Sequence, residues 1–282
     1  MLERHAPAKI NLGLHVLRQR PDGYHDIETV FLRIPWADRV TAEPADDLSM
    51  TCSNPSLPTD GGNFCMQAAQ RLAKAFDVDA GAALHLEKQV PYGAGLGSGS
   101  SDAAATLELL NAMWKVGAPR DALQAIGAEI GSDVPFFLQP EGAAYATGRG
   151  DQLTPLYDAA DVPYRCPFAL VVAVPPVQIA TPEAYQRVTP QEKDRPDLRA
   201  IVSSNDLARW RAELVNDFNA PIRDAYPEVQ AAAQALTDAG AAYVSLSGSG
   251  SAVFGVFAET GPARTAAEAL AEQDCRTRVI PA

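Results

Sequence analysis

The sequence is poor in the features that mark metal-binding, secreted or membrane proteins. Its 282 residues contain four cysteines, at positions 52, 65, 166 and 275, and none forms a Cys-x-x-Cys pair. This spacing argues against a zinc site or a disulfide framework and favours free thiols in a reducing compartment. No apolar run is long enough to span a bilayer, and the charged first residues are unlike a secretory signal. We therefore expect a soluble cytoplasmic protein with no membrane partner.

The sequence also has fewer positively than negatively charged residues. Lys and Arg number 23 against 35 Asp and Glu, which gives a formal net charge of −12. The overall field of such a chain does not attract nucleic acid, so we expect no nucleic-acid partner. If the protein binds a polyanion, local amides, a lysine or a metal ion must hold it.

Helical and strand patterns are mixed along the chain rather than alternating regularly, which favours the α+β class. Residues 8–17 alternate, with Ile10 and Leu12 on one face and Lys9 and Asn11 on the other. Composition shifts near residues 155–165, and we place a domain boundary there, giving domains 1–158 and 159–282. Further strands are expected at 29–34, 83–90 and 168–174 and as a pair within 241–257, and helices at 63–76, 101–116, 121–130, 205–219 and 226–239.

A glycine-rich segment precedes the helix expected at 101–116. Glycines occupy alternate positions from Gly93 to Gly99 and are followed by Ser100 and Ser101. Bare backbone lets a phosphate approach, and the helix N-terminus offers unpaired amides and a positive dipole end. The serine hydroxyls suit phosphate or Mg²⁺. Asp102 would repel a phosphate, so we expect it to point away from the loop or to lie near the metal.

Other glycine motifs fail on spacing. No lysine follows the glycines as a P-loop requires, and the dinucleotide pattern G-x-G-x-x-G breaks at Ser98 or Ser100, which argues against a nicotinamide-dependent oxidoreductase. The segments that accompany the glycine loop of protein kinases are missing. From the glycines alone, a surface loop that caps a helix stays an open interpretation.

The segment PYGAGLGSGSS resembles the phosphate loop of the GHMP kinases, ATP-dependent enzymes that phosphorylate small molecules. APAKINLGL at 6–14 and LSGSGSAVFG at 246–255 match the same family in the expected order. The resemblance implies two α+β lobes with the active site in the cleft between them: an N-terminal lobe like domain 2 of ribosomal protein S5 and a ferredoxin-like C-terminal lobe. It also implies an ATP site formed by Pro91, Tyr92, Gly93, Ala94, Gly95, Leu96, Gly97, Ser98, Gly99, Ser100, Ser101 and Asn63.

Two further segments narrow the resemblance. DGYH at 22–25 and GSDVPFF at 131–137 resemble the branch that phosphorylates the 2-hydroxyl of a cytidine diphosphate-linked methylerythritol, on the non-mevalonate route to isoprenoid precursors. Two alternatives stay open: another kinase of the family, such as homoserine kinase, and a regulatory protein that binds ATP without catalysis. The DGYH and GSDVPFF segments argue against the first. The retention of Lys9 and Asp133 argues against the second.

The resemblance assigns Asp133 as the general base and Lys9 as the residue that assists it. Phosphoryl transfer needs positioning and charge stabilisation more than covalent chemistry. An ammonium near the carboxylate and the substrate hydroxyl would keep the carboxylate ionised. Taken by themselves, Asp133 fits a loop aspartate that caps an amide, and Lys9 fits a surface lysine on a half-exposed strand.

The resemblance also places the substrate. It assigns Tyr24 and Tyr185 to stacking on cytosine, His25 to the edge of the base, and Asn11 to a substrate contact. Phe31 is assigned to the substrate pocket, with a buried strand phenylalanine as the alternative. Asn63, given above to the adenine side of ATP, fits an ordinary helix N-cap equally well.

The chain departs from the family pattern twice, with Ser98 at a common glycine position and with Asp151 where a glutamate is usual in the segment Gly148–Asp151. Ser98 is tolerated if its backbone angle does not require glycine. Mg²⁺ is expected with ATP, held by a loop serine and water, because the sequence has no dedicated side-chain metal site. We expect a monomer or a weak homodimer.

Overall fold

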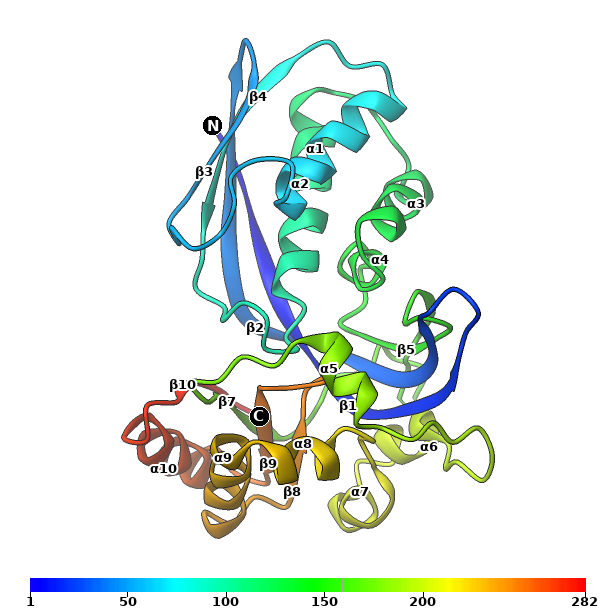
Figure 1. Ribbon diagram of the computed structural model, residues 1–282, viewed down its shortest axis with the longest axis vertical. Helices are drawn as coiled ribbons and strands as arrows, with labels where there is room; N and C mark the ends of the chain where they lie inside the picture. Colours follow the sequence, from blue (N-terminus) through cyan, green and yellow to red (C-terminus); the bar gives the residue numbers. More distant parts are fainter. Residues whose placement is uncertain (159) are drawn as a thin grey trace. The chain divides into compact units, whose positions relative to one another are not determined.

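The computed structural model describes residues 1–158 and 160–282. It contains two compact units, each assembled from separate stretches of chain (Figure 1). The first unit comprises Met1–Ala8, Pro35–Tyr92 and Gly97–Pro140, and the second comprises Lys9–Ile34, Gly93–Leu96 and Glu141–Ala282. The predicted domain boundary between residues 158 and 159 falls at Ala159, outside the described residues, and stays a prediction.

The first unit packs helices on one side of a set of strands (Figure 1). Strand β3 (Leu48–Cys52) pairs parallel to β4 (Gly81–Glu87), and β4 pairs antiparallel to the last part of β2 (His25–Ala45). The helices are α1 (Phe64–Ala75), α2 (Ser98–Met113), α3 (Arg120–Ile130) and α4 (Val134–Phe137). The three predicted helices of this region are confirmed, and α2 begins three residues earlier than expected.

The second unit holds the first hairpin of the chain. Strand β1 (Leu2–Gln19) pairs with β2, which pairs antiparallel to β5 (Ala143–Thr147), and β5 pairs with β6 (Gln152–Pro155). The alternation in residues 8–17 predicts a strand with a polar face. The strand is confirmed, but both faces are buried, and Lys9 is only 4% exposed. The interpretation of Lys9 as a surface lysine is therefore wrong.

A second sheet belongs to the same unit. It consists of β7 (Ala169–Val174), β8 (Tyr243–Leu246), β9 (Val253–Phe257) and β10 (Arg276–Ile280). All three pairings are antiparallel, in the spatial order β10-β7-β9-β8. Numbered along the chain, this order is 4-1-3-2, which a ferredoxin-like split βαβ arrangement produces. The α+β class is confirmed.

Two helices cover this second sheet. Helix α9 (Pro227–Asp238) packs on β8 and β9, and α10 (Thr260–Ala271) packs on β7 and β10. The two helices also contact each other, as Figure 1 shows. Buried aliphatic side chains fill the space between helices and sheet, among them Val171, Val229, Leu236, Val253 and Leu270. Neither α10 nor β10 was among the elements expected from the sequence.

One predicted helix, at residues 205–219, is wrong in its extent. Helix α7 (Leu207–Glu213) ends early, and α8 (Asn219–Ala225) starts after an extended stretch. That stretch lies beside β1: Leu14 N donates to the carbonyl of Val215, and Asp217 N donates to the carbonyl of Leu14. Strand pairing thus takes the backbone groups that a longer helix would need.

Two short helices precede α7 in the second unit, α5 (Thr181–Gln186) and α6 (Leu198–Ser203). Asp197 caps α6, because its carboxylate accepts from the amides of Arg199 and Ala200. Across residues 1–158 and 160–282, no helix is both long and apolar enough to cross a membrane.

Candidate functional site

The glycine-rich loop is shared between the two units along the chain. Residues 93–96 belong to the second unit, whereas Pro91, Tyr92 and residues 97–101 belong to the first. Gly93, Gly95 and Gly97 all have positive φ, at 72°, 80° and 67°. Each part of the loop has its own supports within its unit.

In the second unit, two side chains hold the backbone of the loop in place at Gly95. Its carbonyl oxygen accepts from the Lys9 ammonium at 3.1 Å and from the Ser247 hydroxyl at 2.8 Å. A Cβ at this position would overlap the Ser247 carbonyl oxygen, and φ is +80°. Only glycine satisfies both conditions, so the backbone at residue 95 packs directly on the backbone of the turn at residues 247–251.

The ammonium of Lys9 is held by a chain of hydrogen bonds. Lys9 Nζ donates to Asn11 Oδ1 at 2.7 Å, and Asn11 Nδ2 donates to Thr29 Oγ1 at 2.9 Å. The Thr29 hydroxyl donates to the carbonyl of Gly13 at 2.6 Å. Lys9 Nζ also lies 5.0 Å from the centre of the Phe31 ring, which is buried. Lys9 and Asn11, both predicted as site residues, are therefore brought together at the loop.

The C-terminal glycine turn supports the same part of the loop. Ala252 N donates to the carbonyl of Ala94 at 3.0 Å, while Lys9 N donates to that of Leu96. The turn itself is held by the buried side chain of Asn216, whose Nδ2 donates to the carbonyls of Leu246 and Gly248. The sequence match at residues 246–255 thus corresponds to a structural element that touches the loop.

In the first unit, the loop leads directly into α2. Gly97 takes the left-handed N-cap position, and Ser98 already belongs to the helix. Ser98 therefore does not occupy a conformation that requires glycine, which explains why this departure from the family pattern is tolerated. Among the described residues, no side chain caps this end of α2, which suits an anion-binding helix N-terminus.

The loop serines fit a magnesium ion that has few protein ligands. Ser101 Oγ is buried and has no hydrogen-bond partner among the described residues. In the part of the chain that the structure describes, no cluster of three or more His, Cys, Asp or Glu side chains is placed to hold a metal. Mg²⁺ keeps several waters and binds through phosphates, so a single serine hydroxyl suits it.

Asp133 lies in the turn between α3 and α4, in the same unit as the start of α2. It occupies the N-cap position of α4, is half-buried, and makes no capping bond with its side chain. The Ser132 hydroxyl approaches its Oδ1 at 3.5 Å. A Cβ at Gly131 would lie 3.4 Å from Ser100 Oγ. The turn that carries Asp133 therefore runs past the first turn of α2. The role of Asp133 as general base stays a prediction, beside the interpretation of a capping loop aspartate.

A buried ionic cluster joins the two ends of the loop within the first unit. Lys88 Nζ donates to Asp102 Oδ2 at 2.8 Å and to Asp38 at 2.5 Å, and all three side chains are at most 5% exposed. Asp38 Oδ1 also accepts from the amides of Gln89 and Val90. Asp102, in the first turn of α2, thus faces Lys88, and the same lysine connects it to the segment that enters the loop.

Burial and charge act against each other in this cluster. Burial raises the pKa of Asp102, and the Lys88 ammonium opposes that effect. Burial alone would lower the pKa of Lys88, but the carboxylates of Asp102 and Asp38 outweigh it and raise that pKa. Lys88 is therefore held charged and counterbalances a carboxylate that lies one turn from the phosphate loop.

Asn63 is the N-cap of α1. Its Oδ1 accepts from Cys65 N at 2.9 Å and its Nδ2 donates to the carbonyl of Pro58 at 2.8 Å. A Cβ at Gly99 would lie 3.6 Å from the ring of Phe64, so the start of α1 lies beside the loop. The N-cap interpretation is confirmed, and a contact with adenine stays a prediction.

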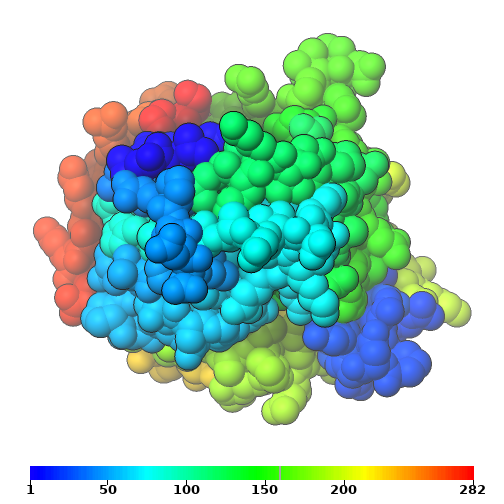
Figure 2. All heavy atoms as spheres, turned by 90° about the horizontal axis from the view of Figure 1, so that it is seen from above, coloured from blue at the N-terminus to red at the C-terminus, as the bar shows by residue number. Residues whose placement is uncertain are grey.

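The predicted cytosine-binding residues lie in the second unit. His25 stacks on Tyr185 from α5, with ring centres 4.5 Å apart and planes 19° apart. Burial lowers the pKa of His25, which favours a neutral imidazole. Tyr24 stands at the hairpin end with 59% of its surface exposed. That hairpin projects as a blue group at the surface in Figure 2. The structure thus joins His25 and Tyr185, which are 160 positions apart, whereas Phe31 is a buried strand residue.

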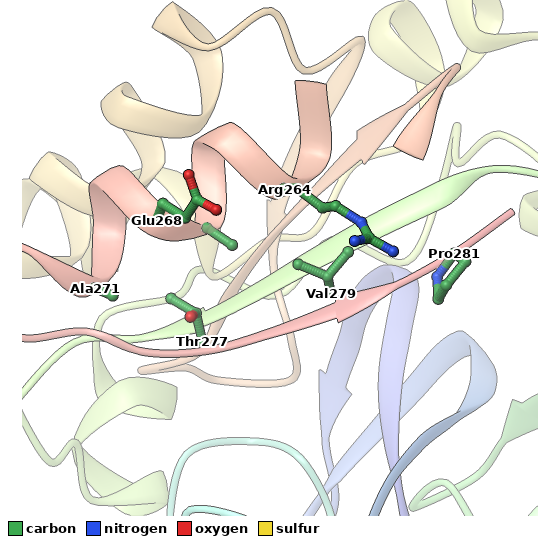
Figure 3. Close-up of a pocket in the computed structure, with 7 residues that line it drawn as sticks. Arg264, Glu268, Ala271, Thr277, Val279 and Pro281 are labelled. Carbon is green, nitrogen blue, oxygen red and sulfur yellow. The ribbon is translucent and has the colours of Figure 1, made fainter. Parts of the chain in front are cut away.

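One groove contains none of the predicted site residues. It has a volume of about 380 Å³ and lies between α10 and β10 of the second unit. Figure 3 shows Arg264 extending from α10 beside Val279 of β10, with Thr277 further along the strand. Its lining offers a single arginine and a single glutamate, Glu268, and does not resemble a phosphate or nucleobase site.

Several residues whose hydrogen bonds support the loop and its neighbours were not predicted from the sequence: Asp38, Lys88, Thr29 and Asn216. Charged residues inside strand patterns, as in WADRV at 36–40 and LEKQV at 86–90, were a usable signal for the first two. Thr29 and Asn216 act through hydrogen bonds to distant residues and leave no local pattern.

Comparison with known proteins finds two family models that match different parts of the chain. The model of the GHMP kinases N-terminal domain matches residues 63–140, and the GHMP kinases C-terminal model matches 196–274. A Salinibacter ruber protein named 4-diphosphocytidyl-2-C-methyl-D-erythritol kinase is 64% identical, over 100% of this chain and 99% of its own length. A protein of the same name from Chlorobium chlorochromatii is 44% identical, over 100% and 96%.

A solved structure also matches. The crystal structure of a 4-(cytidine 5'-diphospho)-2C-methyl-D-erythritol kinase superposes with a TM-score of 0.81 at 36% sequence identity. The match covers 99% of this chain and 98% of the other. Sequence and fold therefore agree over nearly the full length.

Proposed function

The chain belongs to the GHMP kinases, in the group named 4-diphosphocytidyl-2-C-methyl-D-erythritol kinase, and from this membership we propose its reaction. It transfers the γ-phosphoryl group of ATP to the 2-hydroxyl of 4-diphosphocytidyl-2-C-methyl-D-erythritol, giving the 2-phosphate and ADP. The product serves non-mevalonate isoprenoid precursor biosynthesis. The observation that carries the proposal is the 64% identity, over the full chain, to a kinase of that name. The hydrogen bond from Lys9 to Gly95 supports it, because it ties a predicted catalytic residue to the predicted phosphate loop.

In the proposed reaction, the amides and hydroxyls of residues 91–101 hold the triphosphate. Asp133 takes the proton of the substrate hydroxyl, whose oxygen forms a bond to the γ-phosphorus as the bond to the β–γ bridging oxygen breaks. Lys9 stabilises negative charge near the transferred group, with its ammonium fixed by Asn11 and Gly95. A loop serine, of which Ser101 is the candidate, would hold Mg²⁺, which would supply further neutralisation of phosphate charge.

The cytidine end of the substrate is assigned to the hairpin of the second unit. Tyr24 and Tyr185 stack on cytosine, and His25 contacts the edge of the base. The stacked pair of His25 and Tyr185 supports this assignment, because it presents a planar aromatic surface next to the exposed residue Tyr24 in the chain. Asn11 contacts substrate, and Asn63 lies at the adenine side of ATP.

A coupled assay of ADP release tests the function. We expect ADP formation with 4-diphosphocytidyl-2-C-methyl-D-erythritol and Mg·ATP, and none above background with homoserine or without an acceptor. Preferential turnover of homoserine would assign a different kinase of the family. Binding of ATP with no ADP release from any alcohol would indicate a regulatory protein.

Two further measurements test the remaining proposals. Sedimentation of the same preparation tests the proposed monomer or weak homodimer. Fractionation of cells tests the proposed cytoplasmic location.

A further inference from the structure

Tyr24 is an exposed aromatic ring whose position is nonetheless set. The turn before it is closed by backbone bonds from Arg20 N to the carbonyl of Tyr24 and from Gly23 N to that of Arg20. Asp22 Oδ1 accepts from the amide of Tyr24 at 3.1 Å. These bonds fix the backbone, but the ring itself is 59% exposed, and a solvated tyrosine side chain would otherwise rotate freely.

The guanidinium of Arg149 covers a face of this ring. Arg149 Cζ lies 5.2 Å from the ring centre. A guanidinium stacked on an aromatic ring is attracted by the ring's negative face and leaves the opposite face available. Tyr185 has a comparable neighbour, because His25 stacks on it. Both tyrosines assigned to cytosine therefore have a stacked planar neighbour, and Arg149 is the neighbour with no other role in the predicted site.

Arg149 is itself held in place. Its Nε and one terminal nitrogen donate to Asp151 Oδ2 at 3.1 and 2.9 Å, and its amide donates to Asp151 Oδ1. Ile27 N donates to the carbonyl of Gly148 at 2.8 Å, so the turn between β5 and β6 is fixed to the strand that follows Tyr24. Each part of the segment GRGD therefore has a separate task. Gly148 fixes the turn to the strand, Arg149 covers the Tyr24 ring, and Asp151 orients the guanidinium.

We propose that Arg149 is a positioning residue for cytidine recognition, which backs the Tyr24 ring so that the opposite face receives the base. Asp151 fixes the plane of the guanidinium in this role. The inference rests on the proposed function for the identity of the ligand. Its physical basis is preorganisation: ordering the ring before binding removes a cost that the ligand would otherwise meet.

Binding of cytidine 5′-diphosphate, measured by titration calorimetry, tests the proposal without requiring turnover. We expect Arg149→Leu to weaken binding about 3- to 10-fold, within the range of a cation–π contact, and Asp151→Asn to weaken it less. The control is Arg199→Leu, because Arg199 lies 4.8 Å from the Tyr145 ring and pairs with Asp197 in the same way. It should bind cytidine 5′-diphosphate like wild type.

Measurements of turnover then distinguish failure of the positioning role from failure of the proposed function. In the active enzyme, Arg149→Leu should raise KM for the cytidine substrate and leave kcat and KM for ATP unchanged. Equal binding by Arg149→Leu and Arg199→Leu would overturn the positioning role, and so would a wild type that does not bind cytidine 5′-diphosphate. If wild type binds this probe through Arg149 but transfers no phosphoryl group, the proposed function fails and the positioning role stands.

Discussion

Two clusters of charged side chains lie near the predicted ligand-binding segments, and they differ in burial. Asp38, Lys88 and Asp102 are at most 5% exposed and connect the ends of the phosphate loop. At the hairpin, Arg18 and Arg20 pair with Asp26. The two arginine side chains are 63% and 35% exposed, and that of Asp26 is 14% exposed. Buried charges tolerate only one arrangement, whereas exposed pairs exchange readily with water.

This difference in burial fits the different roles proposed for the phosphate loop and the hairpin. In the proposed function, the phosphate loop must present its amides at fixed positions, because it would bind the same triphosphate in every cycle. The hairpin is surface-exposed and holds its aromatic ring through stacking and short-range bonds. On this proposal, the buried cluster of Asp38, Lys88 and Asp102 orders the phosphate loop. The hydrogen-bonded turn at Arg20–Tyr24 and the Arg149 guanidinium order the Tyr24 ring. Two variants test this contrast directly, and a third tests a buried ionisable group outside both clusters.

The largest expected effect is that of Lys88→Met. It leaves two buried carboxylates without their cation, which costs about 3–5 kcal/mol of unfolding free energy. Urea unfolding measures the loss, and KM for ATP should rise because the loop ends are no longer joined. The control is Arg39→Gln, which breaks the neighbouring half-exposed pair with Glu87 and should destabilise far less. A Lys88→Met variant as stable as Arg39→Gln would show that the buried cluster does not order the loop.

The next effect concerns a buried ionisable group in the second unit, His15. Burial lowers its pKa to about 4, and neither ring nitrogen has a hydrogen-bond partner among the described residues. The unfolded chain binds this proton near pH 6.5, so stability is complete above that pH and falls as pH decreases toward 4, by about 3 kcal/mol at most. Unfolding of wild type and His15→Phe across this range measures it. The variant should lack that part of the acid dependence, and identical pH profiles would contradict the account.

The smallest effect is expected for Asp26→Asn in the exposed cluster. The guanidinium groups of Arg20 and Arg18 lower the pKa of Asp26, so its carboxylate is charged at neutral pH. Its loss should lower Tm by about 2 °C or less. The difference should vanish near 1 M salt, where the Debye length is roughly 3 Å, while that of Lys88→Met should persist. A salt-resistant loss as large as that of Lys88→Met would remove the contrast between the two clusters.

Much of the fold follows from local pattern. The alternation in β1 and the helical spacing of α1, α2 and α3 were sufficient to place these elements. The end of α7 at Glu213 was not predictable, because it depends on backbone bonds between Leu14 and a segment 200 residues later. The sheet order β10-β7-β9-β8 likewise depends on pairings between distant strands.

In the candidate site as well, some residues were predictable from local sequence and others were not. Gly95 was identifiable because a phosphate loop needs bare backbone, and Lys9 and Asn11 through the family motif. Lys88 was not identified, since its importance lies in a partner 50 positions away, Asp38. The contact of Arg149 with Tyr24 joins residues 125 positions apart, and only the folded chain brings them together. Local sequence patterns thus predict the residues expected to bind ligands, such as Gly95 and Lys9. They miss the residues, such as Lys88, whose contacts hold the predicted site in place.

The central claim is that the Asp133 carboxylate accepts the proton of the substrate hydroxyl while the loop holds the triphosphate. The most direct measurement is kcat for Asp133→Asn, beside the exposed Asp121→Asn of the same unit as a control. Loss of a general base predicts a fall of about 10²- to 10⁴-fold with unchanged unfolding and ATP binding, and near-normal kcat for the control. A folded Asp133→Asn enzyme whose kcat falls less than about tenfold, or about 1.4 kcal/mol of barrier, would contradict the assignment.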